Sequence, residues 1–305
     1  AQEDTDTEVN TIFDLAEKED LSMPDAQETT SIQEPVVEKI VHDHPIHVHA
    51  FLSTPSETLM KNVQQAEDVL LPAEELLRER NVQALEAIRE GRQRQIVDAL
   101  KQSMRTIEKF FPQKNMWLCT LNYLNANADL WEEHGLHRDL ALPDLFKSQL
   151  IAVKELQDEG LTRVHVLLSS VSSVEEFRHA RQLAQDLGFT LGKDLKLGGL
   201  IDTPAGMGVL SELFAEGMAC TCIQLSALAQ FTIGRKDLKE ETLLHSTVIK
   251  QVTGAIQEAK EMNAPLTVLL PEHVPTGIVQ RLAGMGVTYM AVPSHDVPGL
   301  LQSLA

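Results

Sequence analysis

The sequence predicts an α/β fold, specifically a TIM-type (β/α)8 barrel in which parallel strands alternate with helices. From residue 46 onward, short apolar runs alternate with amphipathic segments, a pattern typical of parallel strands joined by helical crossovers. The chain has 305 residues, so one barrel of about 250 residues fits together with an extension. The clear strand candidates are residues 46–52, 116–122, 164–169, 197–201, 219–224, 266–270 and 288–292.

The segments between these runs predict the helices of the barrel. They cover residues 92–111, 145–159, 173–187, 206–216, 246–262, 277–284 and 297–304. The eighth strand is expected near residues 135–138, where the apolar signal is poor. Residues 56–111 exceed the length of one crossover and are rich in Glu, Leu, Arg and Gln, so they predict a helical insertion after the first strand.

The first 40 residues differ in composition from the rest of the chain. They hold twelve Asp or Glu residues against Lys18 and Lys39. Such a segment buries too little apolar surface to offset the entropy of ordering, so we expect a disordered acidic arm over residues 1–40 and a barrel domain over 41–305. Short apolar spots in the arm leave docking on a partner as an alternative.

Charge and cysteine usage limit the class of partner and the compartment. A net charge of -19 disfavours nucleic acid and anionic lipid, and no apolar run approaches the roughly 20 residues of a membrane span. Phosphorylated small molecules remain candidate ligands, because a pocket can be locally basic even in an acidic protein. Cys119, Cys220 and Cys222 lie in apolar stretches, which indicates the cytoplasm or another reducing compartment. The acidic start of the chain predicts that no intact targeting peptide is present. An organelle-targeting peptide that has already been removed remains an alternative.

Two neighbouring segments carry a resemblance to a known family. Residues 200–214 read LIDTPAGMGVLSELF and residues 222–237 read CIQLSALAQFTIGRKD. They are similar to the paired signature of phosphoenolpyruvate synthases and pyruvate phosphate dikinases, M-x-E-x-P-S followed by S-I-G-x-N-D-L-T-Q-x-T-L-G-x-D-R-D. Residues 110–112, 161–176 and 286–293 resemble further segments of that family. The resemblance implies the C-terminal phosphoenolpyruvate-binding barrel of these enzymes, in degenerate form.

The departures from the family pattern fall where that family performs its chemistry. The phosphate-binding R-x-x-D motif, the Asn-Asp pair with its metal ligand and the proton-transferring Cys all have different residues here. The replaced positions are Cys119, Asn122, Ser226, Ala227 and Leu270. Loss of one electrostatic donor alone typically lowers a rate by about 10²- to 10³-fold, so the combined loss predicts an inactive barrel.

A few residues at family positions still have suitable chemistry. Asp202 replaces the magnesium-binding Glu of the family and is still a hard oxygen ligand, so Mg²⁺ is the cofactor expected if a site is retained. Glu272 is the candidate partner for Asp202. The resemblance also makes Arg138, Arg235 and Gln230 candidates for binding a small phosphorylated or carboxylate ligand.

A histidine pair offers a different metal hypothesis. His47 and His49 alternate along the first strand, so both side chains lie on one face and could hold one ion, as in amidohydrolase-like hydrolases. His295 and Asp296, after the last strand, support this hypothesis. His165 weakens it, because it lies at the start of its strand and barrel active sites lie at strand ends.

The sequence therefore favours a catalytically inactive barrel that serves as a structural or regulatory subunit. The resemblance implies self-association or membership of a larger complex, since this domain is the dimerisation unit of the family. Two enzymatic alternatives remain. One is a phosphoenolpyruvate/pyruvate phosphotransferase component that works in trans, because no ATP-grasp segment or phosphohistidine motif is present. The other is a metal-dependent aldolase of the citrate-lyase type centred on Asp202.

Overall fold

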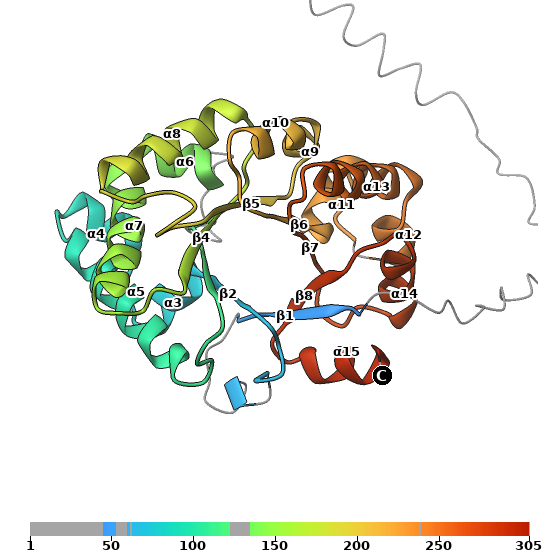
Figure 1. Ribbon diagram of the computed structural model, residues 1–305, viewed down its shortest axis with the longest axis horizontal. Coiled ribbons are helices and arrows are strands. Elements are labelled where there is room, and N and C mark those ends of the chain that lie inside the picture. The colour runs from blue at the N-terminus through green and yellow to red at the C-terminus, as the bar shows by residue number, and fades with distance from the viewer. Residues whose placement is uncertain (1–44, 53–59, 62, 123–134, 238, 305) are drawn as a thin grey trace, which may run out of the picture. The chain divides into compact units, whose positions relative to one another are not determined.

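The computed structural model describes residues 45–52, 60–61, 63–122, 135–237 and 239–304 (Figure 1). Within these residues, parallel strands pair in chain order and β8 pairs with β1, so the sheet closes into a barrel and the predicted fold class is confirmed. The strands are β1 His47–Phe51, β2 Val69–Pro72, β3 Met116–Cys119, β4 Val164–Leu168, β5 Leu197–Ile201, β6 Thr221–Gln224, β7 Leu266–Leu269 and β8 Tyr289–Pro293.

The helices surround the strands in Figure 1. Their bounds are α3 Ala73–Glu79, α4 Ala84–Arg89, α5 Gln93–Glu108, α6 Gly135–Ala141, α7 Pro143–Asp158, α8 Val174–Asp186, α9 Pro204–Gly208, α10 Leu210–Ala215, α11 Leu225–Ile233, α12 Glu240–Leu243, α13 Ser246–Glu261, α14 Thr276–Gly284 and α15 Val297–Leu304. None of the helices in the described part of the chain combines the length and apolar character needed to cross a membrane.

The predicted position of the eighth strand was wrong. Residues 135–138 begin helix α6, and the missing strand is β2, a run of only four residues. It lies inside the segment assigned to a helical insertion after the first strand, so α3, α4 and α5 follow β2 and belong to the crossover from β2 to β3. The four apolar residues of β2 are followed at once by helix-forming sequence. A run of four residues is too short to show whether its apolar residues repeat with the period of a strand or of a helix.

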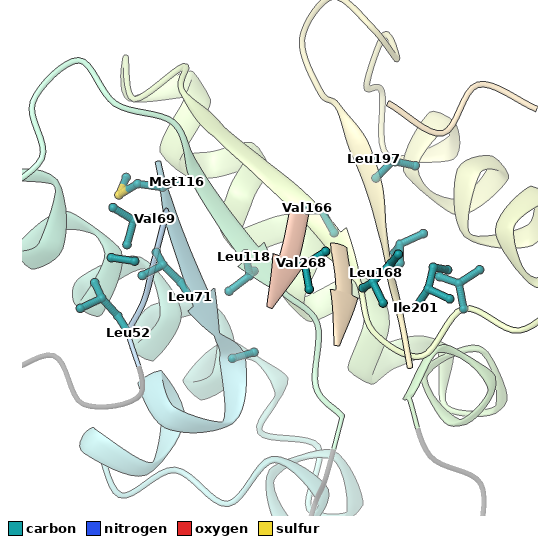
Figure 2. Packing of buried hydrophobic residues seen from close by; sticks show 14 of the residues in the cluster. Leu52, Val69, Leu71, Met116, Leu118, Val166, Leu168, Leu197, Ile201 and Val268 are labelled. Carbon is teal, nitrogen blue, oxygen red and sulfur yellow. The ribbon is translucent and has the colours of Figure 1, made fainter. Parts of the chain in front are cut away.

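Alternate residues of each strand point to opposite sides of the barrel wall. The outward residues, among them Val69, Leu71 and Leu118, pack against the helices and form the larger core (Figure 2). The inward residues form a second apolar cluster: Phe51, Leu70, Trp117, Cys119, Leu167, Leu200, Cys220, Cys222, Leu269 and Ala291. The interior of the barrel is therefore a packed core.

The cysteines of this interior cluster are free thiols. Burial raises the pKa of Cys220 to about 12 and raises that of Cys119 well above its usual value. A thiol becomes nucleophilic only as its thiolate, so both remain protonated and unreactive near neutral pH.

Helix α9 packs closely on the segment after β4, and one glycine makes this approach possible. A Cβ added to Gly206 would lie 2.3 Å from the carbonyl oxygen of Val171, whereas one added to Gly208 would meet no atom within 4 Å. We expect Gly206→Ala to lower the free energy of unfolding by about 1–3 kcal/mol through overpacking. Gly208→Ala, the matched control in the same helix, should leave it unchanged or raise it by up to about 1 kcal/mol. Urea unfolding of both variants would measure the difference, and equal effects would contradict this packing argument.

Candidate functional site at the barrel mouth

The carboxyl ends of the strands surround a pocket of about 190 Å³. Active sites of (β/α)8 enzymes lie at this end, so the pocket is the natural candidate site. Its lining residues are Phe51, Pro72, Glu74, Glu75, Cys119, Asn122, Ser169, Leu200, Gln224 and Leu269. The titratable groups in this described lining are two carboxyls and one buried thiol, and no lysine or arginine is among them.

Asp202 lies directly after β5 and is fully buried. The hydroxyl of Ser170 donates a hydrogen bond to Asp202 Oδ2 and lies 3.1 Å from Asn122 Oδ1. Ser170 follows β4, and Asn122 follows β3. The ends of β3, β4 and β5 therefore bring two residues that the sequence singled out, Asp202 and Asn122, into contact with the hydroxyl of Ser170.

Glu74 is a mouth residue that the sequence analysis missed. It lies in the first turn of α3, directly after β2, and its Oε2 atom is buried without a hydrogen-bond partner. Burial raises the pKa of Glu74 to about 7, against the opposing effect of the backbone N–H groups of Glu74 and Asn122. A carboxylate one or two residues beyond a barrel strand is a recognisable signal, but it could not be used while β2 was unrecognised.

Arg138 is directed into the protein, with only 8 % of its surface exposed. Its Nη1 donates to the carbonyl of Asn122 at 2.8 Å, and its Nη2 donates to the carbonyl of Leu121 at 2.6 Å. Nη2 also lies 3.2 Å from Asp139 Oδ1, and Asp139 accepts a further bond from Gln149. The guanidinium thus holds the backbone after β3, and both of its terminal nitrogens donate to backbone carbonyls there.

The positions of the replaced family residues divide between two neighbouring pockets. Cys119 lines the 190 Å³ pocket, together with Asn122. Ser226 and Leu270 line a smaller pocket of about 150 Å³ at the ends of β6, β7 and β8, where Glu272 also lies. Ala227 is buried in the first turn of α11.

The two remaining ligand candidates lie at the far end of α11. Arg235 is exposed just beyond the helix. Gln230 donates from Nε2 to the carbonyl of Lys236 at 3.1 Å. Neither residue lines either of the two mouth pockets.

Of the two histidines of β1, His47 begins the strand at the end opposite the mouth, and His49 is the middle residue of the strand. The ring of His47 stacks on Tyr289 at 4.8 Å and its Nδ1 bonds to Glu67. His49 is buried, and burial lowers its pKa. Among the described residues, neither histidine belongs to a group of three His, Cys, Asp or Glu side chains with ligand atoms within 4.8 Å of one another.

Glu272 does belong to such a group, but without Asp202. Its neighbours are His273 from the same loop and His295 from the loop after β8. The pairing of Glu272 with Asp202 as joint metal ligands therefore gains no support from the geometry of the described residues.

Comparison with known proteins places these features in a family context. The family model described as "PEP-utilising enzyme, PEP-binding domain" matches residues 28–305. A probable phosphoenolpyruvate synthase of Archaeoglobus fulgidus is 26% identical over 238 residues, 72% of this chain and 31% of that protein. The phosphoenolpyruvate synthase of Pyrococcus furiosus is 25% identical over 257 residues, 77% of this chain and 31% of that protein. The chain thus spans under a third of the length of these relatives.

Solved structures support the same fold. An HpcH/HpaI aldolase/citrate lyase family protein from Burkholderia cenocepacia superposes with a TM-score of 0.55 at 12% identity, covering 86% of this chain and 94% of that one. The CitE protein of Mycobacterium tuberculosis, in complex with magnesium and acetate, has a TM-score of 0.52 at 12% identity and covers 85% of this chain and 91% of that one. At these identities the likeness concerns the fold alone.

Proposed function

The chain belongs to the family of PEP-utilising enzymes, whose PEP-binding domain it matches, and on this premise we propose that it is a member without catalytic activity. In this proposal the barrel acts as a structural or regulatory subunit, in a homo-oligomer or a larger complex, and its acidic residues 1–40 are available to a partner. The observation that carries the proposal is the barrel mouth, whose described lining offers carboxyls but no lysine or arginine.

The charge of the mouth opposes the binding of phosphoenolpyruvate. This ligand carries a phosphate and a carboxylate, and a desolvated anion of that kind needs fixed cations or a metal ion to offset its charge. Glu74 and Glu75 in the lining supply no positive charge, and burial raises the pKa of both carboxyls, so the mouth disfavours anions. Arg138 donates to backbone carbonyls. Residues 53–59 and 123–134, which follow β1 and β3 in the sequence, contain four acidic residues and no lysine or arginine.

The residues present also fit poorly with the Mg²⁺ ion that the family implies. Asp202 is a suitable oxygen ligand, but the Ser170 hydroxyl bonds to its Oδ2 atom. The position of the second family carboxylate holds Ala227, and Leu270 stands where the family has its proton-transferring thiol. Ala227 and Leu270 support loss of the enolpyruvate reaction, because each position lacks a group that acts directly on the reacting atoms.

A calorimetric titration tests the proposal. We expect no saturable binding of phosphoenolpyruvate in the presence of Mg²⁺, with any dissociation constant weaker than the roughly 1 μM–1 mM range in which enzymes usually hold their substrates. Asp202→Ala should behave as the unmodified chain does. Asp186→Ala, at an exposed position on α8, serves as the control for loss of one carboxylate.

One observation favours a second candidate, the metal-dependent lyase. Asp202 is a buried carboxylate at the end of β5, beside the polar side chains of Ser170 and Asn122. The same titration with pyruvate in place of phosphoenolpyruvate examines it. Mg²⁺-dependent binding of either compound, lost in Asp202→Ala and kept in Asp186→Ala, would contradict the non-catalytic proposal and support a retained enzymatic site.

A further inference from the structure

Outside the 190 Å³ pocket, the loops after β7 and β8 bring three metal-binding side chains together. One ligand atom each of Glu272, His273 and His295 lies within 4.8 Å of those of the other two. The two imidazole rings meet edge to face, with their centroids 5.4 Å apart. All three residues are exposed, so an ion would reach them directly from solvent.

A fourth residue, Asp296, orients His273 and lies beside His295. Its Oδ2 accepts a hydrogen bond from the backbone N–H of His273 at 2.8 Å, and its Oδ1 lies 3.3 Å from His273 Nδ1. Oδ2 also lies 3.6 Å from His295 Nε2. Histidines that bind metals commonly donate their other ring N–H to a carboxylate, which fixes the tautomer and the ring direction. The contact with Asp296 Oδ1 therefore leaves His273 Nε2 available as a ligand.

The backbone of His273 also has an unusual conformation. Its φ angle is 53°, in the left-handed region that residues other than glycine seldom adopt. The backbone hydrogen bond to Asp296 helps hold this conformation. Strained residues of this kind concentrate at ligand sites, where the surrounding contacts maintain them.

We propose that Glu272, His273 and His295 bind one divalent transition-metal ion of the zinc type, with Asp296 as the positioning residue. Two imidazoles and a carboxylate suit Zn²⁺, whereas Mg²⁺ prefers an all-oxygen octahedral shell. Zinc–ligand bonds of about 2.0–2.2 Å in tetrahedral geometry put ligand atoms roughly 3.4 Å apart. Exposed side chains can close the remaining gap by small rotations, and the net charge of -19 attracts a cation.

The ion would connect the loop after β7 to the loop after β8. His273 and Asp296 also line a pocket of about 240 Å³ next to α14 and α15, and Glu272 lines the 150 Å³ pocket at the mouth. Three protein ligands leave a fourth position of a tetrahedral zinc ion for water or an anion. The proposed metal site is independent of the proposed function, because the proposal of a non-catalytic barrel rests on none of the three metal ligands.

Titration of the full chain with Zn²⁺, and with Co²⁺ as a spectroscopic probe, tests the site. We expect one Zn²⁺ ion per chain, unaffected by a large excess of Mg²⁺, and visible Co²⁺ absorption typical of four ligands. The double variant His273→Ala/His295→Ala should lose the ion, while His179→Ala, at an exposed histidine of α8, should keep it. Asp296→Asn preserves the shape of the side chain and should weaken binding by about 10- to 100-fold, as loss of such an orienting carboxylate typically does.

Two further histidines near the start of the barrel domain could also bind zinc, so their variant is compared with the variant of the proposed site. His42 and His44 precede β1 and could bind zinc on their own, so the variant His42→Ala/His44→Ala belongs in the same series. We expect it to keep the ion with unchanged affinity. The proposal is overturned if the unmodified chain binds no Zn²⁺, if the ion survives His273→Ala/His295→Ala, or if it is lost with His42 and His44. Circular dichroism of each variant would establish that the fold is intact.

Discussion

Replacing Arg138 with alanine is expected to lower the free energy of unfolding by about 3–5 kcal/mol. The guanidinium is buried, donates to the carbonyls of Leu121 and Asn122, and lies 3.2 Å from the carboxylate of Asp139. Alanine would leave two carbonyl groups without donors and a fully buried carboxylate without its cation. Denaturant unfolding of the variant and the unmodified chain measures the loss.

The size of this loss should depend on pH. Burial raises the pKa of Asp139 to about 7 even though Arg138 acts in the opposite direction. Without Arg138 the pKa rises further, and the protonated carboxyl needs no cation. The destabilisation is therefore expected to be larger at pH 8 than at pH 6, and a second substitution, Asp139→Asn, should recover part of it.

An exposed arginine supplies the control for this experiment. Arg178 forms an ion pair with Glu216 at 2.6 Å, but its side chain is 52% exposed. Arg178→Ala should lower the free energy of unfolding by no more than about 1 kcal/mol, because such surface pairs contribute little. If Arg138→Ala costs no more than Arg178→Ala, the buried network does not hold the segment after β3.

The role of Arg138 illustrates what the sequence could not predict. A lone arginine after a strand is compatible with phosphate binding, and nothing in its neighbours' identities indicates where the guanidinium points. That direction depends on Asp139 and Gln149 and on two backbone carbonyls, which meet only in the folded barrel. Whether the guanidinium of Arg138 binds backbone carbonyls or a ligand is therefore decided by the tertiary structure.

The strands were predictable where their apolar runs were long and clearly bounded. β5 matches its predicted range of residues 197–201, and β4 differs from its prediction by one residue. β2 was missed because its run of four apolar residues lies between polar sequence and helix-forming sequence, where no period can be measured. One missed strand also hid a site residue, Glu74, since its position at the mouth depends on β2.

Asp202 and Asn122, which the sequence singles out as candidate site positions, follow β5 and β3 at the rim where parallel strands end. Their connection through Ser170 was not predictable. Ser170 has a φ of 53°, and this left-handed conformation accompanies the hydroxyl's contacts with both residues. The sequence contains no glycine there to indicate such a turn.

The second large effect is expected for Glu74→Gln, which should stabilise the protein at pH 8. The folded-state pKa of Glu74 is about 7, above its ordinary value of 4.5, because burial disfavours the charged form. Between these two values the unfolded chain ionises Glu74 while the folded chain keeps it protonated, so stability falls as pH rises. Above pH 7 the penalty is fully present and amounts to about 3 kcal/mol.

Glutamine has nearly the same shape as glutamate and does not titrate, so it removes this penalty without opening a cavity. The difference in unfolding free energy between Glu74→Gln and the unmodified chain should be near zero at pH 4 and should grow to about 3 kcal/mol by pH 8. Glu86→Gln, at an exposed position of α4, should show no such change. A difference that stays constant from pH 4 to pH 8 would mean that the folded barrel ionises Glu74 as readily as the unfolded chain does. The mouth would then tolerate charge, which would weaken the electrostatic argument against an anionic ligand there.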